Sequence, residues 1–73
     1  MRFIKCENFF FNGMVNLDHV VEVHTEQMYI DGKPLENVLG VVAQLQFGYG
    51  ERILFMGNAA VCKEYMDELV KEA

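Results

Sequence analysis

The sequence predicts an α+β fold, an antiparallel β-meander of four to five strands with one C-terminal α-helix packed on one face. Short apolar runs separated by turn-forming residues fill residues 1–56, which is typical of antiparallel strands. Apolar residues recur with helical spacing in residues 59–71, after the last strand. Strands followed by a helix indicate α+β rather than a parallel sheet. The 73 residues are enough for one domain, 1–73, and too few for two.

The N-terminal part carries a hairpin signal at Asn12-Gly13, which follows the apolar run from Met1 to Phe11. Asn and Gly both tolerate positive φ, which a type I′ turn requires at its two central positions. A two-residue turn there places Phe11 opposite Met14. Residues 16–19 allow two interpretations, a continuing strand or a short turn. We favour the turn, capped by Asn16, because Asn and Asp bond readily to nearby backbone groups.

The middle of the chain predicts a strand over residues 20–26, a second apolar run at 28–30 and a turn at Asp31-Gly32. Pro34 lacks an N–H donor, so its segment is expected at an edge or in a loop. Residues 36–40 are interpreted as a loop. Alternation over the next segment predicts a half-buried strand whose buried face carries Val41, Ala43, Leu45 and Phe47.

The last third of the chain predicts a turn, a strand and the helix. Gly48-Tyr49-Gly50 forms the turn, and residues 52–56 form a strand that is apolar on both faces. Asn58 is a favourable N-cap for a helix that extends to about Lys71. Its apolar stripe, which packs on the sheet, consists of Cys62, Tyr65, Met66, Leu69 and Val70.

Self-association is expected from apolar residues that fall on both faces of the sheet. One helix covers one face only, and exposed apolar area of this kind marks interfaces. Folding an 8.4 kDa chain reduces its accessible surface from about 12,000 to about 4,600 Å². The apolar burial contributes about 110 kcal/mol, and ordering the chain costs about 110 kcal/mol, so a lone subunit is marginal. Alternatively, residues 35–40 fold over the second face. The expected interface, in a dimer as the first choice, contains Phe9, Phe10, Phe11, Leu54 and Met56.

Several classes of function are disfavoured by composition. The net charge is −5 and the six Lys and Arg are scattered, which argues against nucleic acid as a partner. No stretch has the length of a membrane span or the pattern of a signal peptide, so we expect a cytoplasmic protein with Cys6 and Cys62 as reduced, buried thiols. Thr25 is the sole Ser or Thr residue. The spacing of His19 and His24 suits no metal pair in a strand or helix, so neither a metal, a cofactor nor enzymatic activity is expected.

An alternative function is binding of an anionic ligand such as a nucleotide. The free N–H groups of a helix N-terminus attract anions, and the helix is predicted to begin at Gly57, Asn58 and Ala59. Lys63 lies one turn further along, and Tyr49 is an aromatic group on which a base could stack. A simple Gly-Asn cap accounts for the same residues.

The segment Val15-Asn16-Leu17-Asp18-His19-Val20 resembles an Asn-Leu-Asp-x-Val pattern of small uncharacterised proteins of bacteria and their phages. The resemblance extends over the chain as a layout of N-terminal strand, meander and charged C-terminal helix. It implies a bacterial or phage context and no particular activity. The residues themselves favour a non-enzymatic, acidic interaction or regulatory protein that forms homo-oligomers, with a charged helix face suited to a basic protein partner.

Overall fold

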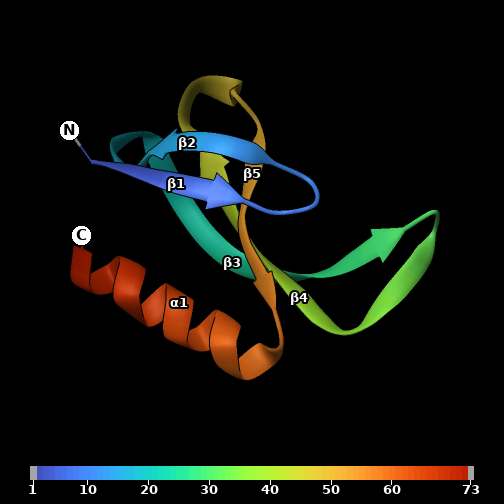
Figure 1. Ribbon diagram of the computed structural model, residues 1–73. Coiled ribbons are helices and arrows are strands. Elements are labelled where there is room, and N and C mark those ends of the chain that lie inside the picture. Colours follow the sequence, from blue (N-terminus) through green and yellow to red (C-terminus); the bar gives the residue numbers. More distant parts are fainter. Residues whose placement is uncertain (1, 73) are drawn as a thin grey trace.

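The computed structural model describes residues 2–72, which form five strands, two short 3₁₀ turns and one α-helix (Figure 1). β1 and β2 form a two-stranded antiparallel sheet, and β3, β4 and β5 form a three-stranded antiparallel sheet in that order. The α+β class with a C-terminal helix is therefore confirmed. The expected first strand began at Met1, which lies outside the described residues. The elements are β1 (Phe3–Glu7), β2 (Asn12–Asn16), β3 (Val20–Ile30), β4 (Lys33–Leu45), β5 (Glu51–Gly57) and α1 (Ala59–Glu72).

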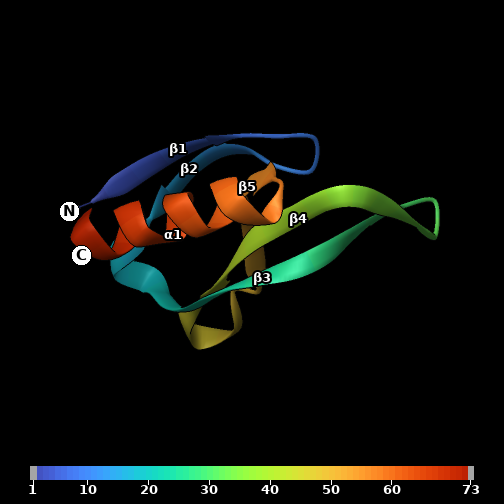
Figure 2. The same ribbon diagram turned by 90° about the horizontal axis from the view of Figure 1, so that it is seen from below.

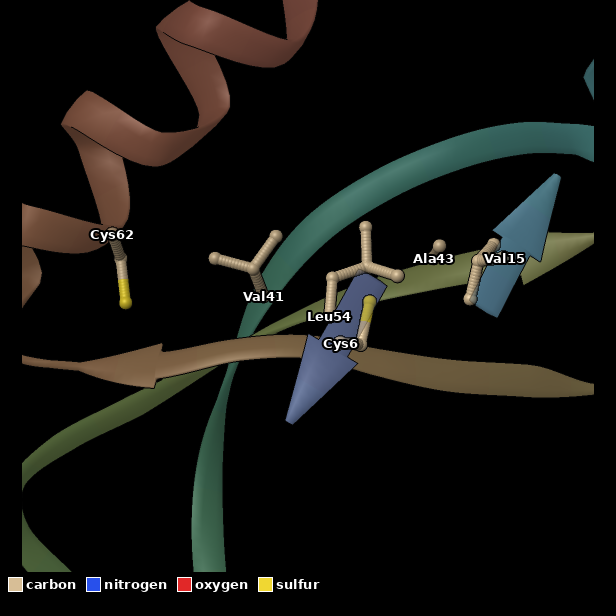
Figure 3. Close-up of a cluster of buried hydrophobic side chains, with 6 residues drawn as sticks. All are labelled: Cys6, Val15, Val41, Ala43, Leu54 and Cys62. Carbon is tan, nitrogen blue, oxygen red and sulfur yellow. The ribbon is translucent and has the colours of Figure 1, made fainter. Parts of the chain in front are cut away.

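The β1–β2 hairpin and α1 both lie on the same side of the three-stranded sheet (Figure 2). The core forms where these three parts meet, and Figure 3 shows its buried members. The hairpin contributes two of them, the sheet three and the helix one. The opposite side of the sheet, called the open face below, carries Val42 of β4 between His24 of β3 and Ile53 of β5, and Val42 is 2% exposed there. The six core residues are Cys6, Val15, Val41, Ala43, Leu54 and Cys62.

The first hairpin forms, but its turn is not at Asn12-Gly13. Asn12 pairs with Glu7 in the sheet, and the turn comprises residues 8–11. Asn8 holds this turn, because its Oδ1 accepts hydrogen bonds from the N–H groups of Phe10 and Phe11, both at 2.9 Å. This local side-chain bond outcompetes the Asn-Gly preference. Gly13 instead provides space, since a Cβ there would lie 3.1 Å from the Phe11 ring.

The turn expected after β2 is confirmed at Leu17–His19, where the Asn16 Oδ1 accepts a hydrogen bond from the Asp18 N–H at 3.0 Å. β3 then runs to Ile30, further than expected. A bulge near its start shifts the side-chain alternation by one residue. As a result, both Val20 and Val23 pack against the core despite their odd spacing.

β4 is one continuous strand, so the loop expected over residues 36–40 is wrong. Asp31 and Gly32 form the predicted turn, with φ values of 51° and 78°. β3 pairs with β4 on both sides of residues 35–38, which have no partner in β3, and Asn37 adopts φ 58° at this irregularity within the strand. Pro34 pairs with Tyr29, beyond the part of β4 that pairs with β5. The missing N–H of Pro34 therefore removes no hydrogen bond between β4 and β5.

The end of β4 differs from the predicted alternation. The strand stops at Leu45, and Phe47 lies in a 3₁₀ turn with φ 58° and 88% exposure. The expectation that Phe47 lies on the buried face is therefore wrong. Gly48 and Gly50 adopt positive φ, as the predicted turn requires.

β5 carries apolar side chains on consecutive residues because it contains a bulge. Phe55 pairs with Val41 and Ile53 with Val42, which leaves Leu54 as the extra residue. Its side chain points into the core and is 3% exposed (Figure 3). α1 follows as predicted, with the Asn58 Oδ1 accepting from the Val61 N–H at 3.0 Å.

Candidate interaction surface

The five residues expected at an interface occupy different environments. Phe9 and Phe10 lie on the 8–11 turn, 75% and 41% exposed, and their rings meet edge to face at 5.1 Å. Phe11 is turned inward, packs against the core and lies under the Arg52 guanidinium. Leu54 is enclosed within the subunit's own core, so its side chain offers no surface to a partner. Met56 is partly buried on β5.

An apolar groove lies between the C-terminal half of α1 and the start of β3. Its volume is about 260 Å³, and most of its lining is aliphatic. The stripe of α1 supplies one wall, where Val70 remains 75% exposed although the other stripe residues pack on the core. The bulge in β3 supplies the other wall by directing Val20 and Val23 to the same side. The lining residues are Arg2, Leu17, Val20, Val23, Met66, Leu69 and Val70.

The groove opens beside the free edge of β3. Within residues 2–72, β3 pairs with β4 alone, so one side of this 11-residue strand leaves its backbone groups without a strand partner. The other edge of the sheet is different. There the hairpin approaches β5, and the Asn8 Nδ2 donates a hydrogen bond to the Ile53 carbonyl at 2.8 Å.

The open face beside this edge is charged. His24 Nε2 lies 2.8 Å from Glu26 Oε1, and His24 Nδ1 lies 3.5 Å from Glu22 Oε1. The hydrogen bond to Glu26 raises the pKa of His24 above its usual range, and burial opposes this rise. The charges of Glu26, Glu22 and Glu51 add to it. The strand therefore presents alternating negative, positive and negative groups at residues 22, 24 and 26 once His24 is protonated.

Two thiols and a phenol also have shifted pKa values. Burial raises the pKa of both Cys6 and Cys62, which keeps these thiols protonated and weakly nucleophilic. Burial also raises the pKa of Tyr65 to about 12, and its ring stacks on Phe55 at 4.7 Å. His19 lies in the 3₁₀ turn before β3, away from the alternating run that holds His24. Among residues 2–72, no three His, Cys, Asp or Glu gather as a metal site.

The candidate anion site at the start of α1 is only partly assembled. A groove of about 490 Å³ adjoins Asn58 and Ala59 and is otherwise lined by residues of β3, β4 and α1. The Asn58 side chain caps the helix and already accepts a hydrogen bond from the Val61 N–H, one of the free N–H groups that an anion would need. Tyr49 precedes β5 whereas Gly57 ends it, a separation of roughly 20 Å at the rise of an extended strand. Tyr49 therefore cannot stack on a ligand held at the helix N-terminus, and Lys63 does not line the groove.

Comparisons with protein-family models, curated proteins and solved structures gave no match to this chain. Among residues 2–72, no helix combines the length and apolar character needed to cross a bilayer. The sequence-based reasoning missed the groove and the free β3 edge. The pattern Glu22-x-His24-x-Glu26 was a visible signal for the edge, since it places alternating charges on one face of a strand.

Proposed function

We propose that this chain is a non-enzymatic interaction protein that acts as a homo-oligomer, with a dimer as the basic unit. The observation that carries the proposal is the amount of apolar surface that the subunit leaves uncovered. The aromatic turn at Phe9 and Phe10 and the groove at Val70 are both exposed. Exposed apolar surface on a small protein is characteristic of interaction sites.

The size of the subunit's surface supports the same proposal. The subunit has 5116 Å² of accessible surface, whereas a compact monomer of this mass exposes about 4,600 Å². The β3–β4 hairpin contributes to the difference because it projects beyond the rest of the fold (Figures 1 and 2). The excess of about 500 Å² is comparable with what one partner loses in a small interface.

A binding role is favoured over catalysis by the chemistry of the side chains. The two thiols are buried and have raised pKa values, and the chain offers Thr25 as its sole Ser or Thr hydroxyl. His24 is hydrogen-bonded to a glutamate on an open sheet surface rather than held in a cleft beside a nucleophile.

The proposal is tested by measuring the mass of the full chain by light scattering from low to high micromolar concentration. We expect the mass to approach twice 8.4 kDa as the concentration rises. A mass of 8.4 kDa throughout this range, for a chain that unfolds cooperatively, refutes the proposal.

A further inference from the structure

We infer that two copies of this chain pair along the free edges of β3, antiparallel and centred on Val23, to form a continuous six-stranded sheet. This inference rests on the proposed self-association and specifies its surface. The partner is a second copy of this chain, placed so that the two apolar grooves adjoin at Val23. The aromatic turn at residues 8–11 lies outside this interface.

The two edges of the three-stranded sheet differ in what covers them. On the β5 side, the Asn8 side chain already bonds to the Ile53 carbonyl, and the hairpin packs nearby. On the β3 side, no strand of residues 2–72 pairs with the outer backbone groups. Unpaired strand edges readily add another strand, since the backbone hydrogen bonds provide the attraction. β3 is therefore the edge at which the sheet can grow.

Charge determines the register of such a pairing. Around His24, the strand alternates as glutamate, histidine, glutamate on the open face. A two-fold axis at His24 would place each Glu22 opposite the second copy's Glu26, which is repulsive. An axis at Val23 places each Glu22 opposite the second copy's His24, so two complementary pairs form. An axis at Thr25 forms two His24–Glu26 pairs, and charge alone does not exclude it.

The apolar groove distinguishes these two registers. Val20 and Val23 line the groove from β3, and Val70 lines it from α1. With the axis at Val23, the two Val23 side chains meet, so the two grooves adjoin at this residue. With the axis at Thr25, each Val23 lies opposite the polar Gln27 instead. Burial of apolar surface therefore favours Val23 as the centre.

Disulfide trapping in the full chain tests this geometry. Residues on the axis of an antiparallel pair have Cα atoms about 4.5–5.5 Å apart, which is within the range for a disulfide. Val23→Cys should therefore form a covalent dimer under mild oxidation. Thr25→Cys is the matched control, because the two copies of residue 25 would lie about 13 Å apart. The wild-type chain controls for Cys6 and Cys62, both buried.

A second pair of variants tests the groove without altering β3. Val70→Lys places a charge on the exposed groove wall and should raise the dimer dissociation constant at least about tenfold. Val61→Lys makes the same change in charge on the same helix, outside the groove, and should leave dissociation nearly unchanged. Circular dichroism of each variant establishes that it is folded.

The outcomes separate the inference from the proposed function. Cross-linking of Val23→Cys but not Thr25→Cys, together with weakening by Val70→Lys alone, supports the inference. A wild-type dimer in which Val23→Cys stays unlinked, or Thr25→Cys links instead, overturns the inference and leaves self-association standing. A wild-type chain that is monomeric at every concentration overturns both.

Discussion

Replacing Leu54 by alanine tests whether this residue belongs to the core, as the structure places it, or to an interface. Leu54 is 3% exposed and lies among the buried side chains where hairpin, sheet and helix meet (Figure 3). Leu→Ala at such a site removes buried methyl groups and leaves a cavity, at a cost of about 3 kcal/mol. A domain of this size has about 4–11 kcal/mol in total, so the melting temperature should fall by about 12–24 °C.

The assay is urea unfolding followed by circular dichroism, at one fixed protein concentration because association contributes to stability. Leu35→Ala is the matched control, since Leu35 is only partly buried on the projecting β3–β4 hairpin. It should cost less than about 1 kcal/mol. If Leu54→Ala costs no more than Leu35→Ala, the assignment of Leu54 to the core is wrong.

Three further predictions address the turn, the β5–α1 junction and the charged strand. Asn8→Ala removes two accepted hydrogen bonds and one donated to β5, and should lower the unfolding free energy by about 2 kcal/mol. Asn8→Asp, which keeps the acceptor, should lose less in the same urea titration. Gly57→Ala should cost about 1–3 kcal/mol, because its Cβ would overlap the stiff, β-branched Val61 side chain. Unchanged thermal unfolding would contradict this. The raised pKa of His24 stabilises the fold below the ordinary histidine pKa of 6.5, and this contribution disappears as the pH rises through the folded-state value. Wild-type stability should therefore fall relative to His24→Asn above pH 6.5, and parallel pH profiles would show that the charge pairs contribute nothing.

Much of the fold could be predicted because its signals are local. The Asp31-Gly32 turn, the Asn16 cap and the Asn58 cap each depend on residues within one turn of the chain, and the structure has all three. The Asn12-Gly13 turn failed because Asn8 offers a competing local interaction that spans a longer turn. Its third bond, to Ile53, is 45 residues distant in sequence and could not be foreseen.

The candidate surface was less predictable because bulges determine it. Strict alternation would place the side chains of Val20 and Val23 on opposite faces of the sheet. The bulge at the start of β3 instead places both on the face that lines the groove. A second bulge in β5 moves Leu54 from the expected interface into the core. Bulges depend on how two strands pair, and neither strand's own sequence specifies them. The exposure of Phe9 and Phe10 has a related cause: both lie in a turn, where consecutive side chains do not have to point to opposite faces as they do in a strand.

Amide hydrogen exchange of β3 as a function of protein concentration tests the central claim most directly. The outward amides of a free edge exchange rapidly, whereas a paired edge protects them. We predict that peptides covering residues 20–26 gain protection between low and high micromolar concentration, while the turn at residues 8–11 does not. Unchanged exchange at residues 20–26, or protection that appears at residues 8–11 instead, would contradict pairing of two subunits through this strand.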